Sequence, residues 1–209
     1  YLTYQRNLDY QDQVTMWQSC VDAWPTNART HTGLASSLFK LQRYPEALSA
    51  CDAAIKLDPG FPGIHYLKGN IYRAMGQTDK MFESYNNEIQ SQPMHPWAFH
   101  ARGVAKLSLG DFRSAYEDFT SAVKIRPDLV EFQYLKAKTA HKLNLGEEAL
   151  TGYSEILKRE PQRTEAYQMR GALYDEMGRF TEAEADFSRA AELDPRSIAT
   201  YFNLGSVRK

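Results

Sequence analysis

The side chains that usually perform chemistry in proteins are present in this chain, but their spacing matches no common catalytic or metal-binding pattern. His31 and His65 lie 34 residues apart instead of forming an HxxxH ligand pair, and His95 flanks a predicted connection between helices. Cys20 and Cys51 belong to no CxxC motif and to no Cys/His pair at metal spacing. The sequence contains no GxGxxG, GxxxxGKS/T, GxSxG or HExxH motif. We therefore predict a protein that is not an enzyme and needs neither a cofactor nor a metal.

Pairs of acidic residues are the remaining groups that could perform acid–base chemistry. Glu147 with Glu148 and Glu182 with Glu184 fall where helices are predicted to begin or on helix faces. Negative charge at those places interacts favourably with the helix dipole or with solvent. We interpret these residues as solvated helix positions, and both cysteines as small apolar helix residues.

Composition limits the classes of partner. The 209 residues carry 25 basic and 26 acidic side chains, for a formal charge of −1, so no long-range field draws the chain to nucleic acid or anionic lipid. No apolar run approaches the length of a membrane span, and the first twenty residues lack the order of a signal peptide. We expect no direct membrane insertion of this segment. Because the sequence begins with Tyr1 instead of Met, one interpretation is that it is a piece of a longer protein.

The chain has an internal period of 34 residues, marked by Pro25, Pro59, Pro93, Pro127, Pro161 and Pro195. A fixed period of this size predicts a stacked-repeat architecture. Small residues recur twenty-four places before each proline from Pro59 onward, at Ala35, Gly69, Gly103, Ala137 and Gly171, and Gly205 takes the next position of this column. Mostly aromatic residues recur eight places before it, at Trp17, Cys51, Tyr85, Phe119, Tyr153 and Phe187. Large side chains are therefore expected to face small ones.

Each unit is predicted to contain two helices, since apolar and small residues recur at helical spacing within it. The break between the two helices contains "MGQT", "LGDF", "NLGE" or "MGRF", where glycine suits the left-handed residue that closes a helix. The second helix ends at the proline, which would cost roughly 3 kcal/mol inside a helix.

These columns resemble the tetratricopeptide repeat, a 34-residue helix-turn-helix, and "TEAYQMRGALYDEMGRFTEAEADFSRAAELDP" carries nearly its whole pattern. The resemblance implies an all-α fold, a right-handed superhelical solenoid of stacked helix-turn-helix units (an α-α superhelix), in one domain over 1–209. Five full repeats would span 28–61, 62–95, 96–129, 130–163 and 164–197, after a partial repeat at 1–27 and before a terminal capping helix at 198–209. Lys68, Lys106, Met81 and Glu88 depart from the pattern, so we expect looser packing in repeat two.

A shorter resemblance lies in "TYQRNLDYQDQVTMW", residues 3–17. Arg6, Asn7, Tyr10, Asp12 and Trp17 resemble the junction between the last membrane span and a tetratricopeptide tail in polytopic membrane proteins. That resemblance implies an extracytoplasmic domain. The alternative is that Tyr10 and Trp17 are packing residues of a truncated repeat, which leaves a cytoplasmic location open.

In this family the first helices of successive units line a concave groove that binds peptides. The resemblance places nine residues of this chain in such a groove: Tyr66, Asn70, Arg73, Trp97, His100, Tyr134, Lys138, His141 and Lys142. Exposed Tyr, Trp and Arg often dominate interface energetics, although some of these aromatics could pack against neighbouring helices instead. The carboxylate clamp of chaperone-binding relatives is absent, because Thr32, Ser36 and Leu67 stand at its first places.

Two classes of function follow from these observations. The first is a non-catalytic scaffold that binds a protein or peptide ligand in the groove. The alternative is an accessory or regulatory domain of a larger membrane-bound protein, such as a glycosyltransferase. An RNA-reading repeat is disfavoured by the balanced charge and by the Gly/Ala and Pro columns. The sequence determines neither the partner nor the oligomeric state.

Overall fold

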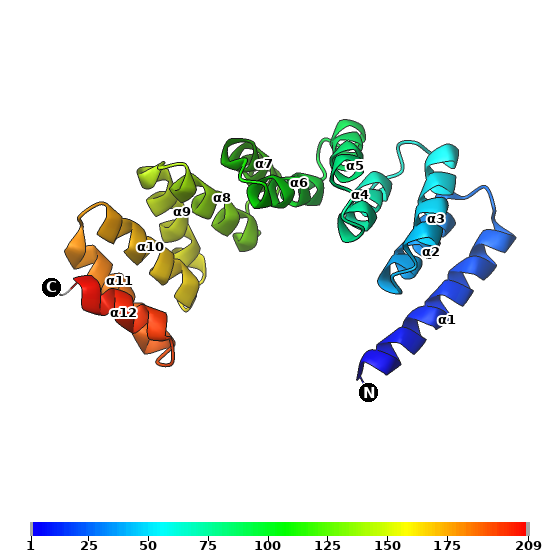
Figure 1. Cartoon of the computed structure of the whole chain (residues 1–209). Coiled ribbons are helices and arrows are strands. Elements are labelled where there is room, and N and C mark those ends of the chain that lie inside the picture. The colour runs from blue at the N-terminus through cyan, green and yellow to red at the C-terminus, as the bar shows by residue number, and fades with distance from the viewer. Residues whose placement is uncertain (1, 208–209) are drawn as a thin grey trace. The chain divides into compact units, whose positions relative to one another are not determined.

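The computed structural model describes the backbone of residues 2–207 and the side chains of residues 11–207. Over the described backbone the regular structure consists of twelve α-helices without strands (Figure 1). The chain divides into two compact units, residues 1–98 and 99–209.

Helices alternate along each unit with short connections. The first unit contains α1 (Leu2–Ala23), α2 (Ala28–Lys40), α3 (Tyr44–Leu57), α4 (Ile64–Ala74) and α5 (Thr78–Ser91). Helix α6 (Pro96–Ser108) begins at the end of the first unit and lies mostly in the second. The second unit continues with α7 (Phe112–Ile125), α8 (Val130–Lys142), α9 (Gly146–Arg159), α10 (Thr164–Glu176), α11 (Phe180–Leu193) and α12 (Ile198–Val207).

Aromatic rings packed on small residues join the two helices of a repeat. A Cβ atom added to Gly69 of α4 would lie 2.5 Å from the ring of Tyr85 in α5. The same place in α10 is taken by Gly171, where the Phe187 ring of α11 would lie 3.0 Å from an added Cβ. Both rings are almost completely buried. A larger residue at either glycine would force the two helices apart.

A left-handed residue closes the first helix of each repeat. Gly76, Gly110 and Gly178 have φ values of 70°, 80° and 73°, which confirms the role predicted for these glycines. The prediction is wrong for Gly146 of "NLGE", which is the first residue of α9. Gln42 and Asn144 stand at the same place in their repeats, with φ values of 60° and 58°. A side chain in this conformation is strained, because its Cβ approaches the following carbonyl oxygen.

Repeat two departs from the pattern but has a specific internal structure. Met81 and Glu88 are both buried, Glu88 completely. The Glu88 carboxylate accepts hydrogen bonds from the backbone N–H of Gly63, at 2.8 Å, and of Tyr66, at 3.1 Å. It therefore satisfies two of the free N–H groups at the start of α4. This contact accounts for a carboxylate where the other repeats have a small or apolar residue.

Helix α12 packs on the last repeat through one face only. Leu204 joins Phe187 in a buried cluster, whereas Ile198 and Phe202 are 84% and 76% exposed. A Cβ added to Gly205 would meet no atom within 4 Å. The capping role of this helix stays a prediction.

In the first unit, Cys51 of α3 is buried, and burial raises the pKa of its thiol to about 12.

We predict that Gln42→Gly stabilises the chain by about 1 kcal/mol, because glycine adopts the left-handed conformation without the Cβ clash. The reverse change, Gly178→Gln, should destabilise it by a similar amount. Urea unfolding followed by circular dichroism at 222 nm measures both variants against the parent chain. Equal unfolding midpoints for Gln42→Gly and the parent would contradict the assigned strain.

Candidate functional site

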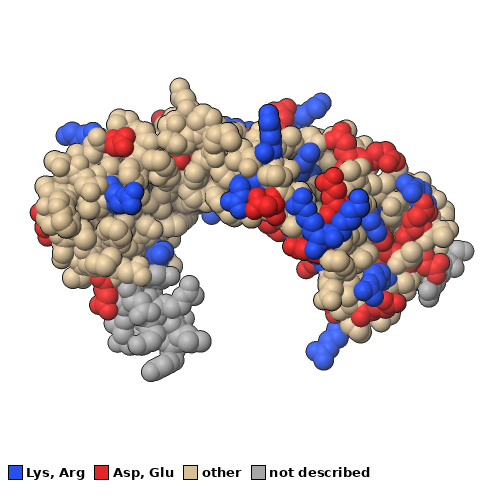
Figure 2. Space-filling view, turned by 180° about the vertical axis from the view of Figure 1, so that it is seen from behind, with Lys and Arg blue, Asp and Glu red and all other residues tan. Residues whose placement is uncertain are grey.

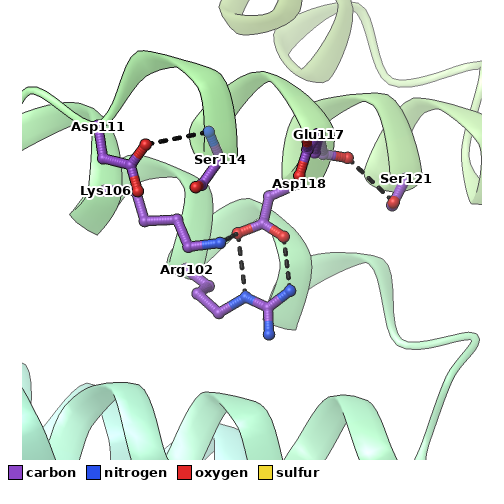
Figure 3. Close-up of polar contacts among 7 residues, drawn as sticks. All are labelled: Arg102, Lys106, Asp111, Ser114, Glu117, Asp118 and Ser121. Atoms are coloured by element: carbon purple, nitrogen blue, oxygen red, sulfur yellow. Dashed lines mark hydrogen bonds and ion pairs between the residues drawn. The ribbon is translucent and has the colours of Figure 1, made fainter.

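A buried ion cluster holds α6 against α7. Arg102 donates two hydrogen bonds to the carboxylate of Asp118, over 3.0 Å from Nε and 2.6 Å from Nη2 (Figure 3). The ammonium of Lys106 lies 2.9 Å from the same carboxylate, and Asp118 is only 3% exposed. Lys106, which departs from the apolar residue expected there, thus has a defined partner. The cluster fixes the orientation of the two helices.

The same pairing recurs in repeat five. Arg170 of α10 donates two hydrogen bonds to Asp186 of α11, at 2.7 and 2.8 Å, and a third to Ser154. The hydrogen bond to Asp186 outweighs burial and raises the pKa of the Arg170 guanidinium. Charged bidentate pairs of this kind are stronger and more directional than neutral hydrogen bonds. They set the position of the first helices, which carry the residues predicted to bind a partner.

In the first unit, Tyr66 and Asn70 of α4 make internal contacts. The Tyr66 ring lies 5.2 Å from the ring of His95 and 6.1 Å from that of Tyr85. Asn70 accepts a hydrogen bond of 2.8 Å from the Tyr85 hydroxyl. Both predicted residues are half-buried, so part of each side chain supports packing.

Two other predicted residues of the first unit face solvent. Arg73, one turn after Asn70, is exposed, and Trp97 at the start of α6 is 43% exposed. His100 lies three residues further along α6, with its ring 5.0 Å from Phe132 and 6.2 Å from Phe119. Trp97 is thus partly exposed, and His100 packs within the second unit.

Tyr134 of α8 is held between two neighbours. Its ring lies 6.4 Å from that of Tyr153, and the Arg163 guanidinium lies 4.7 Å from its centroid. Arg163 also forms ion pairs with Glu131 and Glu160, at 2.9 and 3.0 Å. Burial raises the pKa of the Tyr134 hydroxyl, so this side chain is neutral at physiological pH.

The last three predicted residues meet in one pocket of the second unit. Lys138, His141 and Lys142 lie on one face of α8 and line a pocket of about 330 Å³. Its other lining residues are Asn144, Met169, Ala172 and Glu176, of which the last three come from α10. This pocket, between the first helices of two successive repeats, is called the α8–α10 pocket below.

The α8–α10 pocket has a net positive charge. His141 Nε2 lies 2.8 Å from the Glu176 carboxylate and joins α8 to α10. Neither Lys138 nor Lys142 forms an ion pair with a residue that the structure describes. On the face shown in Figure 2, charged side chains of both signs gather over the C-terminal unit. An anionic group entering the pocket would meet two ammonium groups that lack a partner.

Models of the tetratricopeptide repeat match residues 28–61, 50–83, 106–173 and 164–197. The chain belongs to the tetratricopeptide repeat family. Solved structures of the family show the same fold. YrrB, described as a TPR protein with an unusual peptide-binding site, superposes with a TM-score of 0.78 at 16% identity, over 89% of this chain and 96% of YrrB. MamA superposes with a TM-score of 0.71 at 18% identity, over 81% of this chain and 92% of MamA. The predicted all-α superhelical repeat fold is confirmed.

Curated relatives of this tetratricopeptide repeat chain are longer proteins. The human mitochondrial import receptor subunit TOM70 is 23% identical over an alignment of 148 positions, which covers 68% of this chain and 24% of TOM70. The human protein O-mannosyl-transferase TMTC3 is 22% identical over an alignment of 221 positions, which covers 98% of this chain and 24% of TMTC3. Hsp70-Hsp90 organizing protein 3 of Arabidopsis thaliana is 25% identical over 85% of this chain and 32% of that protein. The chain thus spans a quarter to a third of these relatives.

Some lining residues of the α8–α10 pocket were not among the nine predicted from the sequence. Asn144 follows the end of α8 and was read only as part of a helix break. Met169 and Ala172 lie three residues apart on α10, and this helical spacing was the one feature of the sequence that could have placed them on a common face.

In the part of the chain with described side chains, no group of His, Cys, Asp and Glu residues could hold a metal ion. Among the described helices, none has the length and apolar character needed to cross a membrane.

We predict that Asp118→Asn destabilises the chain by about 2 to 3 kcal/mol, because Arg102 and Lys106 would lose a buried counter-charge. Glu117→Gln is the matched control, since the neighbouring Glu117 is exposed and should change stability by less than about 0.5 kcal/mol. Chemical denaturation of both variants provides the comparison. Similar losses in the two variants would mean that the cluster contributes little to stability.

Proposed function

We propose that this chain is a non-catalytic protein-interaction scaffold, and that the first helices of its second unit bind an extended peptide segment of a partner protein. The observation that carries the proposal is the α8–α10 pocket. It brings Lys138, His141 and Lys142 together on the surface formed by two first helices. The likeness to YrrB, described as having an unusual peptide-binding site, supports a peptide as the ligand.

The chemistry of the pocket favours an acidic side chain of that peptide. Lys138 and Lys142 are four residues apart on α8, so both ammonium groups can approach one carboxylate. Their two positive charges exceed the single carboxylate of the pocket, that of Glu176, which lies 2.8 Å from His141 Nε2. Met169 and Ala172 add an apolar surface that can cover the methylene groups of an Asp or Glu side chain. A partner with an Asp- or Glu-containing extended segment fits this arrangement.

Selection of peptides from a random twelve-residue phage library against the chain tests this proposal. We predict enrichment of sequences that contain Asp or Glu. Each selected peptide should bind Lys138→Glu/Lys142→Glu at least about tenfold more weakly, a loss of about 1.4 kcal/mol, because attraction becomes repulsion. Fluorescence polarisation with the labelled peptides measures the affinity, and a higher salt concentration should weaken it.

The control is Lys124→Glu/Lys158→Glu, which makes the same charge change on exposed lysines of the second helices α7 and α9. It should bind the selected peptides with an affinity close to that of the parent chain. Selection of neutral or basic peptides, or equal losses in both double variants, would show that the α8–α10 pocket is not the binding site. Tyr66 is a poorer test position, because its ring packs on His95 and a substitution there would disturb the first unit.

A second candidate function is supported by the similarity to TMTC3, which extends over 98% of this chain. We propose as the alternative that the chain is the accessory repeat region of a membrane-bound glycosyltransferase. The junction-like segment at residues 3–17 is compatible with this alternative, although Arg6, Asn7 and Tyr10 lie outside the residues whose side chains are described. In that case the scaffold would hold the substrate or assist assembly of the longer protein.

The coding sequence upstream of Tyr1 distinguishes the two candidates. The accessory role predicts codons for several membrane-spanning helices in the same reading frame, followed by a glycosyltransferase activity that falls when the repeats are deleted. Mannosyl transfer by membranes that express the whole reading frame, with and without residues 28–197, measures this effect. An open reading frame without such spans would exclude the accessory role and leave the scaffold.

A further inference from the structure

Repeat four lacks the ion pair that joins the two helices in repeats three and five. In those repeats an arginine of the first helix holds a buried aspartate of the second. The corresponding residues of repeat four are Lys136 and Gly152. With no carboxylate opposite it, the Lys136 ammonium lies over the ring of Tyr116, 5.6 Å from the centroid. The contact between α8 and α9 is close at Gly152, where an added Cβ would lie 2.8 Å from that of Ala137.

The missing side chain leaves a pocket of about 340 Å³, bounded by α7, α8 and α9. Ala137 and Ala140 of α8 line it together with Val123 of α7, which gives it an apolar part. It differs from the α8–α10 pocket, because it uses two second helices and another face of α8. We call it the α7–α9 pocket.

Most polar groups of the α7–α9 pocket are hydrogen-bond acceptors. Glu147, Glu148 and Glu155 contribute three carboxylates, against the single ammonium of Lys136. Glu155 forms no ion pair with a described residue, and Glu148 accepts a hydrogen bond from the Tyr116 hydroxyl. Burial and this carboxylate raise the pKa of Tyr116 to about 12, so its ring is that of a neutral phenol. The pocket therefore has a net negative charge and an aromatic face.

Gln133 provides an independent indication that a donor is missing. This residue lines the pocket and is only 7% exposed. Its Nε2 atom donates a hydrogen bond of 2.9 Å to the carbonyl oxygen of Pro127, while its Oε1 atom is buried without a partner. A buried acceptor without a donor is unfavourable, and a ligand with N–H groups would remove that penalty.

We propose that the α7–α9 pocket binds an arginine side chain of a partner protein. The guanidinium offers five donors and a planar face, which suit a site with three carboxylates, an unpaired amide oxygen and a tyrosine ring. The methylene groups of the arginine would lie on Ala137, Ala140 and Val123. This site is separate from the α8–α10 pocket, so a failure of the peptide-binding proposal would leave it unaffected.

The probes are N-acetyl-arginine amide, the neutral isostere N-acetyl-citrulline amide and N-acetyl-aspartate amide, each titrated into ¹⁵N-labelled chain. For the arginine probe we predict saturable shifts in the ¹H–¹⁵N spectrum at millimolar concentration, centred on Lys136, Thr151 and Gly152. The citrulline probe should give shifts at least tenfold smaller at the same concentration. Equal shifts with citrulline, saturable shifts of Lys136, Thr151 and Gly152 with the aspartate probe, or no saturable shift with arginine would overturn the proposal.

A double variant tests the location. Ala137→Gly/Gly152→Asp rebuilds the arrangement of repeats three and five, where a Cβ added to the glycine of the first helix would lie 3.2 Å from the Cβ of the aspartate. The new carboxylate should pair with Lys136, fill the pocket and weaken arginine binding at least tenfold. Glu117→Gln, outside the pocket on α7, should bind like the parent chain.

Should that double variant fail to fold, Glu148→Gln/Glu155→Gln decides the question. It removes two surface carboxylates and should weaken binding of the arginine probe at least fivefold. Unchanged binding in a folded double variant of either kind would refute the site.

Discussion

A ring packed against a glycine, which has no side chain, is the contact on which the helical hairpins of repeats two, three and five depend. Tyr85 on Gly69 and Phe187 on Gly171 leave no space for even one additional carbon atom. A fully buried aromatic side chain contributes about 2 to 3 kcal/mol through burial of apolar surface. More importantly for function, the contact fixes the distance and rotation between the two helices. The directions in which the other faces of the first helix point follow from this contact.

This constraint determines which residues of α8 can meet a partner. Ala137 faces α9, where an added Cβ on Gly152 would lie 2.8 Å from its own Cβ. Two residues along an α-helix correspond to a rotation of roughly 200°. Lys138 therefore projects on nearly the opposite side from Lys136, and Lys142, six residues along α8, lies roughly 120° around the helix from it. One helix thus carries a cationic pocket on one face and contributes to an anionic pocket on another, and the two surfaces suit partners of opposite charge.

The features that depend on local sequence could be predicted. The 34-residue period, the paired helices and the left-handed glycine at positions such as Gly76 each follow from a few neighbouring residues. Contacts between helices were harder to predict from the sequence. Glu88 was expected to loosen repeat two, yet its carboxylate caps α4 from 25 residues away. Asn70 accepts a hydrogen bond from Tyr85 that the pattern did not indicate, and its position in the groove stays a prediction. Such contacts depend on side-chain rotamers that a sequence pattern does not specify.

The binding surfaces show the same limit. The spacing of Lys138, His141 and Lys142 placed them on one helix face, and the structure brings them into one pocket. To predict the pocket walls that α10 contributes, one would need the packing angle between successive repeats, which the sequence pattern does not specify. The α7–α9 pocket was not predicted at all, because it arises from an absent side chain at Gly152, and a glycine in a helix pattern gives little indication of what surrounds it.

Internal repetition provides a criterion for separating structural residues from binding residues. A residue pair that returns at equivalent positions in the same contact, such as the arginine and aspartate of repeats three and five, is explained by packing alone. A departure from the repeat requires a reason of its own. For Glu88 the reason lies inside the chain, since its carboxylate has two backbone donors. For Lys136 and Gly152 no described residue replaces the missing carboxylate, and the neighbouring Gln133 retains an unpaired oxygen. A departure whose polar groups stay unsatisfied within the chain indicates a group supplied from outside it.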